Sequence, residues 1–460
     1  MRLRRAALDL GVLAALGTGV VLFTAWLGAE LDPGDFGRPI ALLAGIALAF
    51  LVLWGLAVLW VLARRPPARA AFVLVVLVAA ASRLFLVQGE PALSNDVFRY
   101  VWDGRVQAAG INPYAHAPAD PALAHLRDEE LYARLNREEV RTIYPPVAQG
   151  AFRLLYLLHP DSVAWTKLAL VALDLAAVVL LASLLVRVGR RPELSLLYAW
   201  HPLAIFEIGG SGHLEALLVL LLLLALHAAV RGRALLAGIA LGAAGLVKFY
   251  ALSALPALAG GGRRIHLAAA VGATVLLAYL PFAEVGLRAL GYLPGYLEEE
   301  GFASGYRFYL LGLVEQMTST DGAVLTAGYV VLSGACLAGV ALASARGPAT
   351  PGEMASRALL LLVLMLVLAT PTYPWYALVV IALLPLGRGL VLLPASAVTL
   401  TAPLLYLHIS IGSHPTWPRH LVYGAGAAAL ALAAALAVGR RRLAARPQPA
   451  PPALVATATE

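Results

Sequence analysis

Residues 94–114 read SNDVFRYVWDGRVQAAGINPY, and residues 142–150 read TIYPPVAQG. Together they bound the longest polar passage in a chain otherwise built of apolar runs. All three asparagines of the chain fall inside it: Asn95, Asn112 and Asn136. The passage from 90 to 141 also holds nine acidic residues and six arginines. A protein that only spans a bilayer has no use for such a segment, so we look for chemistry here.

The composition around this passage predicts the fold class. Of 460 residues, 61% are hydrophobic and 13% are charged, and the mean hydropathy is +0.82. Soluble domains are nearer half apolar and a quarter charged. Repeated apolar runs of membrane-spanning length predict an all-α, polytopic membrane helix bundle of about 12–14 segments. We expect one domain over 1–446, with short interfacial helices in the polar passage, and a disordered tail at 447–460.

The positive charge is placed as in membrane proteins. The net charge of +8 comes from arginines that cluster between apolar runs, as at 64–65, 187–191 and 440–442. This positive-inside pattern argues against a nucleic-acid partner and predicts both termini in the cytoplasm. The loops at about 89–160 and 284–322 would then be extracytoplasmic. The first apolar run continues to about Leu27 without a clear cleavage site, so we expect a retained helix.

Two further features of the apolar part lead to predictions. The run 234–260 has arginines at both ends, so one span cannot keep both flanks cytoplasmic. Two short helices that meet near Lys248 fit better, because broken backbone is tolerated inside a bundle. The single cysteine, Cys336, cannot form an intramolecular disulfide, and we expect it to pack in the core.

A helical face in the polar passage carries candidate chemistry. Asp96, Tyr100, Asp103 and Gln107 follow the spacing i, i+4, i+7, i+11 and share one face of a helix, with Arg99 and Arg105 beside it. A carboxylate at the membrane interface can act as a general base toward the hydroxyl of an amphiphilic substrate. The alternative is a solvated amphipathic helix whose charges form Asp–Arg pairs, and spacing alone favours that alternative.

Several motifs resemble one enzyme family. The first block, followed by IYPPVAQ, is similar to the polyprenol-phosphate-sugar-dependent glycosyltransferases of the GT-C fold, above all the bacterial mannosyltransferases of family 87. The resemblance extends to WHPLAIFEIGGSGHLEA at 200–216, GAAGLVKFYAL at 242–252 and PTYPWY at 371–376. It implies a multi-pass enzyme of the bacterial cytoplasmic membrane with an extracytoplasmic active site.

The resemblance implies roles for particular residues. Asp96 occupies the position of the base that deprotonates the acceptor hydroxyl. Many relatives have two adjacent acids there, whereas this chain reads Asn95–Asp96, which argues against a metal bridging two acids. We expect no cofactor. The residues expected to shape and close the pocket are Asn95, Arg99, Tyr100, Asp103, Arg105, Asn112, Tyr144 and Gln149.

The donor phosphate needs a cation, and two positions are candidates. Lys248 is one of only two lysines, and an ionised group in mid-membrane marks either a site or a buried pair. Its structural alternative is an ion pair with Asp174, Glu207 or Glu215. Arg307 lies between Tyr306 and Tyr309, where guanidinium would suit phosphate. Its alternative is a snorkelling arginine in an aromatic belt.

Other polar residues are candidates for sugar binding. His201, Glu207 and His213 would bond to sugar hydroxyls or to the bundle. We do not expect metal there, because His213 and Glu215 are two residues apart and do not share a helical face. Tyr373, Trp375 and Tyr376 can stack on a sugar or mark the interface. Weaker candidates are His414, Arg419 and His420.

The sequence thus predicts a membrane glycosyltransferase with a polyprenyl-phosphate sugar donor, expected to be mannose, and a glycolipid or lipid-linked glycan acceptor. Two alternatives stay open. The same scaffold would serve another sugar, such as arabinofuranose or glucose. A lipid-linked saccharide flippase or transporter would need polar residues along a path through both leaflets, whereas here they gather on one side.

Overall fold

The computed structural model describes residues 2–30, 40–91, 93–260, 264–317, 322–347, 349–409 and 417–444. Within these ranges the regular elements are all helices. Nine of them are long and apolar enough to cross a membrane, and four shorter apolar helices accompany them. The all-α polytopic bundle is confirmed, with nine candidate spans in the described ranges where about 12–14 membrane segments were predicted. The predicted disordered tail and His414 lie outside the described residues.

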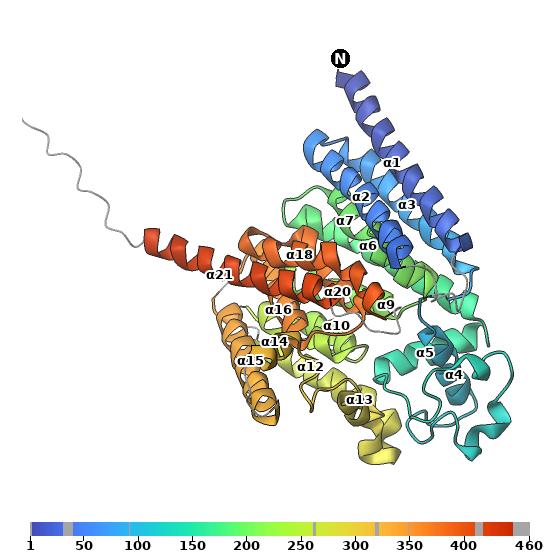
Figure 1. Ribbon diagram of the computed structural model, residues 1–460. Helices are drawn as coiled ribbons and strands as arrows, with labels where there is room; N and C mark the ends of the chain where they lie inside the picture. Colours follow the sequence, from blue (N-terminus) through green and yellow to red (C-terminus); the bar gives the residue numbers. More distant parts are fainter. Residues whose placement is uncertain are drawn as a thin grey trace, which may run out of the picture.

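The first layer of the bundle is tied by a buried ion pair. It consists of α1 (Arg2–Glu30), α2 (Ile40–Arg64), α3 (Ala68–Val87) and α6 (Val163–Arg187) (Figure 1). Arg83 of α3 pairs with Asp174 of α6 at 2.6 Å, and both side chains are fully buried. Arg83 also donates to the carbonyl of Ala199 at 2.8 Å. Because a charge inside a bilayer is costly unless it is paired, this contact fixes α3 and α6 together.

The next segment is broken into several short helices. They are η3 (Pro192–Ser195), α7 (Leu196–Ala199), α8 (Pro202–Ile205) and η4 (Phe206–Gly210). Pro202 has no N–H to continue a helix, and the imidazole of His201 accepts the N–H of Leu203 at 3.2 Å. The continuous helix α9 (Glu215–Val230) follows these short helices.

The predicted break at Lys248 is confirmed. The helix α10 (Ala234–Gly245) ends before it, and η5 (Phe249–Ala254) and α11 (Leu255–Leu258) follow it. Lys248 itself has an extended backbone, with φ −148° and ψ 124°. Since α10 packs between α9 and α12 (Arg264–Tyr279), this break presents Lys248 inside the bundle.

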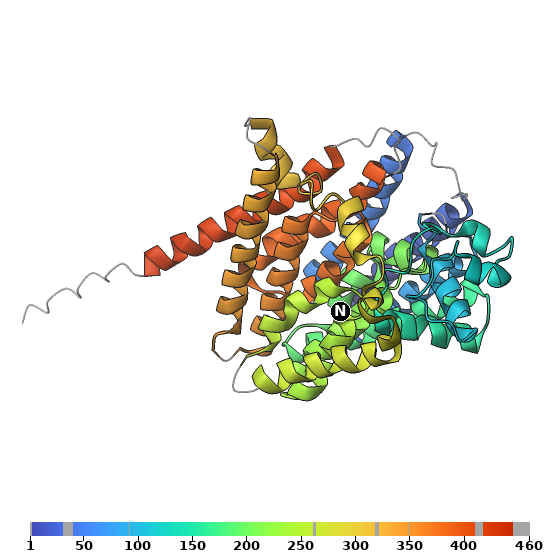
Figure 2. The same cartoon turned by 90° about the horizontal axis from the view of Figure 1, so that it is seen from below.

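The C-terminal part packs around α16 (Pro351–Ala369), which contacts both α17 and α18. The other elements here are η6 (Leu280–Leu290), α13 (Leu293–Glu299), α14 (Tyr309–Met317), α15 (Gly322–Ala345), η7 (Pro374–Ala377), α17 (Leu378–Leu383), η8 (Leu384–Leu386), η9 (Gly389–Val391), α18 (Leu392–Thr401), η10 (Ala402–Leu404), α19 (Leu405–Ile409), α20 (Trp417–Arg419), η11 (His420–Gly424) and α21 (Ala425–Ala444). In both ribbon views α15 and α21 lie at the opposite end of the molecule from α4 and α5 (Figures 1 and 2).

The prediction that Cys336 packs in the core is wrong. The residue lies on α15 and is exposed. Only 6% of the most apolar part of this helix is buried within the protein. Hydropathy identifies a membrane helix but does not say which of its faces meets protein and which meets lipid.

The polar segment, residues 88–162, forms a separate layer at one side of the bundle (Figure 1). It holds α4 (Asp96–Ala108), η1 (Pro121–Leu126), η2 (Tyr132–Arg134) and α5 (Pro146–Leu158). The segment that follows η6 joins it, because the N–H of Tyr292 donates to the carbonyl of Thr142 at 3.0 Å. Gly291 allows this approach: its φ is +62°, and a Cβ there would overlap the same carbonyl oxygen.

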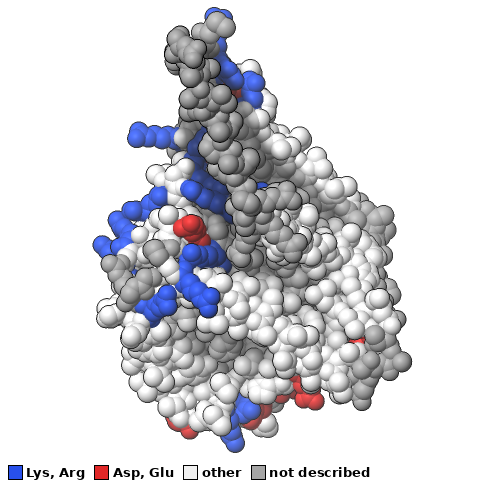
Figure 3. Space-filling view, turned by 90° about the vertical axis from the view of Figure 1, so that its left-hand side faces the viewer, with Lys and Arg blue, Asp and Glu red and all other residues white. Residues whose placement is uncertain are grey.

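Charged side chains are unevenly distributed over the surface. In Figure 3, lysines and arginines gather on one part of the face shown, while a few charges of both signs lie at the lower edge. The surface between these two groups is largely uncharged. Such a band between charged edges is what a bilayer requires of the surface that faces its hydrocarbon.

Candidate active site

Close packing of α4 on α5 positions the candidate base. Gly104 makes the crossing possible, since a Cβ there would lie 2.7 Å from the carbonyl oxygen of Phe152. Pro146 begins α5 at a position where its missing N–H is not needed. Asp96 is the first residue of α4, so its carboxylate lies where the helix dipole favours negative charge.

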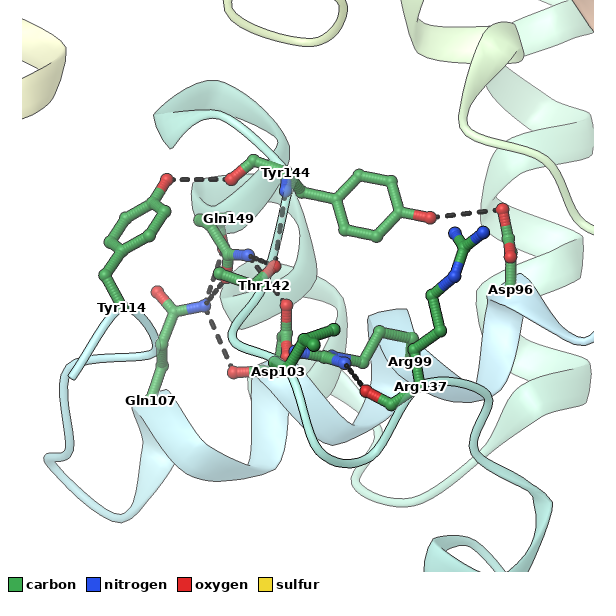
Figure 4. A network of polar contacts seen from close by, with 10 residues as sticks. Asp96, Arg99, Asp103, Gln107, Tyr114, Arg137, Thr142, Tyr144 and Gln149 are labelled. Carbon is green, nitrogen blue, oxygen red and sulfur yellow. Dashed lines mark hydrogen bonds and ion pairs between the residues drawn. The ribbon is translucent and has the colours of Figure 1, made fainter. Parts of the chain in front are cut away.

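The carboxylate of Asp96 accepts two hydrogen bonds from neutral groups. Oδ1 accepts from Nδ2 of Asn136 at 2.9 Å, and Oδ2 accepts from the hydroxyl of Tyr144 at 3.1 Å. Figure 4 shows the side chain of Tyr144, which lies just before α5, pointing at Asp96. Among the described residues no basic side chain forms an ion pair with Asp96. The carboxylate is therefore oriented without being neutralised.

The surroundings of Tyr144 keep its hydroxyl protonated and aimed at Asp96 as a hydrogen-bond donor. Burial, and then the negative charge of Asp96, raise the pKa of Tyr144 well above its ordinary value. Tyr100 lies behind it, edge-on at 5.1 Å, and stacks on Phe152 at 4.6 Å. Burial likewise raises the pKa of Tyr100. Both phenols stay protonated, and this aromatic support fixes the direction of the Tyr144 hydroxyl.

The second acid of the same helix has a different environment. Asp103 is 2% exposed. It accepts from Nε of Arg99 at 2.9 Å and from Nε2 of Gln149 at 2.7 Å. Gln107 completes the network by donating to Oε1 of Gln149 at 2.8 Å (Figure 4). This network joins α4 to α5, and Asp103, Gln107 and Gln149 are all buried.

A cavity of about 1010 Å³ opens in front of Asp96. This is at the upper end of the size range of pockets that enclose small-molecule ligands. Its lining from the polar segment includes Asn95, Asp96 and Asn136, and its lining from the bundle includes the apolar side chains of Leu362 and Val379. The predicted site residues that line it are Asn95, Asp96, Arg99, Tyr144, Lys248, Arg307, Tyr373, Trp375 and Tyr376. The structure therefore brings together residues from both halves of the chain.

Comparison with known protein families gives the chain its class. Residues 7–260 match the MptA/B family, described as alpha-(1->6)-mannopyranosyltransferase, N-terminal domain. The chain belongs to this mannosyltransferase family. The family uses polyprenol-phosphate mannose and has the GT-C fold, as the sequence motifs predicted. No curated protein matches the chain significantly. The matched region holds Asp96 and its partners, but the cavity continues beyond it to Val379.

On the far wall of the mannosyltransferase cavity, Lys248 is neutralised. Its ammonium forms an ion pair with Glu215, which is fully buried. It also lies over the rings of Trp375 and Tyr376, at 5.9 and 4.9 Å from their centroids. Lys248 thus forms the ion pair with Glu215 that was given as its alternative to phosphate binding, although the residue also borders the cavity.

Glu215 belongs to a buried ion cluster, which we define as Glu207, His213, Glu215 and Lys248. The imidazole of His213 lies between the two acids, 3.3 Å from Glu207 and 3.6 Å from Glu215. It also stacks on Trp375, with ring centroids 4.1 Å apart. Trp375 in turn stacks on Tyr373 at 4.4 Å. The ion cluster therefore supports an aromatic wall of the cavity, and its His and Glu residues do not line that cavity themselves.

Arg307 is also occupied by protein groups. It forms an ion pair with Glu300 and donates through Nε to the carbonyl of Ala369 at 2.8 Å. Its guanidinium lies over the ring of Phe302 at 4.4 Å. Arg419, a weaker candidate, donates to the carbonyl of Arg307. Arg307 thus links the segment after α13 to the end of α16.

The remaining predicted residues lie outside the cavity. Arg105 pairs with Asp128 at 2.5 Å and with Asp161 at 2.6 Å, across the polar segment. Asn112 donates to Glu284 at 2.9 Å. His201 is buried and contacts the carbonyl of Thr399 at 3.2 Å. Other predicted residues away from the cavity lining are Tyr100, Asp103, Gln149, Glu207, His213 and His420.

Several lining residues were missed by the sequence reasoning. Asn136 was noticed as one of three asparagines, but no spacing rule linked it to Asp96 across 40 residues. Arg137 and Arg141 were counted among the arginines of the polar passage without a role. Tyr292 directly precedes α13 and Tyr296 lies within it, and both line the cavity. A dense group of arginines beside an asparagine was the one local signal available.

No group of three or more His, Cys, Asp or Glu side chains in the described ranges is arranged to hold a metal ion. Asn95, which stands where many relatives have an acid, accepts a hydrogen bond from Asn136 at 2.8 Å. The side chain of Asn95 therefore helps to orient the amide of Asn136, which donates to Asp96.

Proposed function

We propose that this mannosyltransferase moves mannose from a polyprenyl-phosphate carrier to a glycolipid or lipid-linked glycan on the extracytoplasmic face of the membrane. Asp96 is the base. The observation that carries the proposal is the carboxylate of Asp96, which borders the cavity and, among the described residues, is held by the neutral donors Asn136 and Tyr144. A base needs such a setting, because a cationic partner would compete for the electron pair that takes the proton.

The reaction needs few protein groups. The acceptor oxygen attacks the anomeric carbon as its proton passes to a carboxylate oxygen of Asp96. The bond from that carbon to the phosphate oxygen breaks, and the phosphate leaves with the electron pair. Since phosphate is a good leaving group, no general acid is required, and positive charge near the phosphate stabilises its departure. A single displacement inverts the anomeric centre, so an alpha product requires a beta-linked donor.

The two kinds of lining in the cavity suit an amphiphilic donor. The polar segment contributes Asp96, and the bundle contributes the apolar side chains of Leu362, Leu366 and Val379. We place the sugar beside the first and the start of the polyprenyl chain beside the second. The arginine pattern supports the proposed orientation, with both termini in the cytoplasm. The acceptor hydroxyl then approaches from the side of the polar segment.

A transfer assay tests the proposal. Purified protein in detergent receives radiolabelled beta-linked polyprenyl-phosphate mannose and a membrane lipid extract. Wild type should make labelled glycolipid, and Asp96→Asn should lose about 10²–10⁴-fold in rate. Glu129→Gln is the matched control, because Glu129 is an exposed carboxylate of the same segment. Equal rates for wild type and Asp96→Asn would remove Asp96 as the base. Product with a glucose or arabinofuranose donor, and none with mannose, would overturn the donor sugar.

A further inference from the structure

The cations that line the cavity differ in their partners. Within the described residues they are Arg99, Arg134, Arg137, Arg141, Lys248 and Arg307. Five of them pair with a carboxylate: Arg99 with Asp103, Arg134 with Glu90, Arg137 with Glu299, Lys248 with Glu215 and Arg307 with Glu300. In the part of the chain that the structure describes, Arg141 has neither an ion pair nor a side-chain hydrogen bond.

The backbone beside Arg141 is held on both sides. The carbonyl of Val140 accepts from Nη2 of Arg99 at 3.1 Å. Thr142 accepts from Gln149 through its hydroxyl at 2.8 Å and from Tyr292 through its carbonyl at 3.0 Å. The protein thus fixes the peptide of this residue and leaves its guanidinium without a partner.

An unpaired guanidinium in this place calls for an anion. Arg141 is half-buried, so it loses part of its hydration without gaining a protein acceptor. Guanidinium offers a planar fork of N–H donors that matches the oxygens of a phosphate. The lining carboxylates are Glu90, which is already paired with Arg134, and Asp96.

We propose that Arg141 binds the phosphate of the polyprenyl-phosphate donor and of the polyprenyl-phosphate product. This rests on the proposed function. Arg141 precedes Tyr144 by three residues, and the hydroxyl of Tyr144 contacts Asp96, so the proposed phosphate site and the residue that orients the base share one stretch of chain. Lys248 and Arg307 are excluded from the main role because Glu215 and Glu300 already neutralise them.

Equilibrium binding to the purified full chain in detergent tests this assignment. Radiolabelled polyprenyl phosphate is compared with the uncharged polyprenol of the same length. Wild type should prefer the phosphate, and Arg141→Gln should lose about 10–100-fold of that preference, the worth of a charge-assisted hydrogen bond. Arg141→Lys should keep part of it, since it keeps the charge and loses the fork. Arg153→Gln is the control, because Arg153 is exposed in the same segment, away from the cavity.

The outcomes separate the two levels of the argument. If Arg141→Gln folds, as judged by an unchanged Tm, and keeps the preference for phosphate, the role of Arg141 is overturned and the donor class stands. If wild type shows no preference for phosphate over polyprenol, the donor class fails and the role of Arg141 fails with it. In the transfer assay, Arg141→Gln should raise KM for the donor, whereas Arg153→Gln should not.

Discussion

Two acids near the cavity, Asp96 and Glu215, are compensated in different ways. Asp96, in the polar segment, borders the cavity and accepts hydrogen bonds from neutral Asn136 and Tyr144. Glu215, in the bundle, is fully buried and is met by the ammonium of Lys248 and the imidazole of His213. A carboxylate next to free space without a counter-charge can take up a proton from a substrate. A buried and neutralised one holds helices together.

The largest expected effect separates activity from stability at Asp96. Asp96→Asn should lower the transfer rate by about 10²–10⁴-fold, because the amide cannot accept the proton. Its Tm in detergent should stay near that of wild type, since the amide oxygen can still accept from Asn136 and the amide N–H can donate to the hydroxyl oxygen of Tyr144. A large fall in Tm would show that the carboxylate is structural and would erase the contrast with Glu215.

Glu215→Gln should do the reverse. It leaves the ammonium of Lys248 without its buried counter-charge, which costs about 3–5 kcal/mol of folding free energy. Tm measurements would detect this loss, with Glu130→Gln as an exposed control. The double variant Glu215→Leu with Lys248→Met should recover much of the stability, because it removes both charges. If the double variant does not recover stability, the ion cluster stabilises the bundle by more than the pairing of these two charges.

A smaller change probes how Asp96 is oriented. Tyr144→Phe removes one hydrogen bond to a charged acceptor, worth about 1.5–3 kcal/mol, and should slow transfer by about 10–100-fold. The aromatic contacts with Tyr100 and Phe152 persist, so Tm should change little. Rates equal to wild type would show that Asn136 alone positions the base.

The smallest effect concerns pH and the outer part of the polar segment. Burial opposes the ionisation of Asp128, but the N–H groups of Leu131 and Tyr132 and the guanidinium of Arg105 outweigh it and lower the pKa below its usual value. A lowered pKa in the folded state stabilises above the ordinary value near 3.9 and loses its effect as pH falls through the lowered one. The Tm difference between wild type and Asp128→Asn should therefore be present at about pH 6 and be lost as the pH falls through the lowered pKa of Asp128. A Tm difference that persists at the lower pH would show that Asp128 stabilises the fold through packing or neutral hydrogen bonds rather than through its charge.

Much of the scaffold could be predicted because membrane helices are local features. The apolar runs and the break at Lys248 follow from length and from charge at the ends. The breaks before α9 are harder to predict, because Pro202 and the cap by His201 act within a few residues of apolar sequence. The position of Cys336 was missed because hydropathy does not distinguish lipid from protein as a neighbour.

The site was only partly predictable, because a shared helical face is not a shared site. A helix rises about 1.5 Å per residue, so Asp96 and Gln107 stand about 16 Å apart along α4. One end meets the cavity and the other packs on α5. The partners of Asp96 come from residues 40 and 48 positions away, and much of the remaining lining comes from residues 247 and later. Such distant pairings depend on tertiary packing, which no local pattern records.

The joint lining of the cavity also has a consequence for biosynthesis. Tyr144 leaves the ribosome more than two hundred residues before Tyr376. At about 5–20 residues per second, the interval is roughly ten to fifty seconds. During that time the wall with Asp96 exists without the aromatic wall that faces it. The enzyme therefore becomes competent late in its own translation, and a nascent chain arrested after α11 would be inserted but inert.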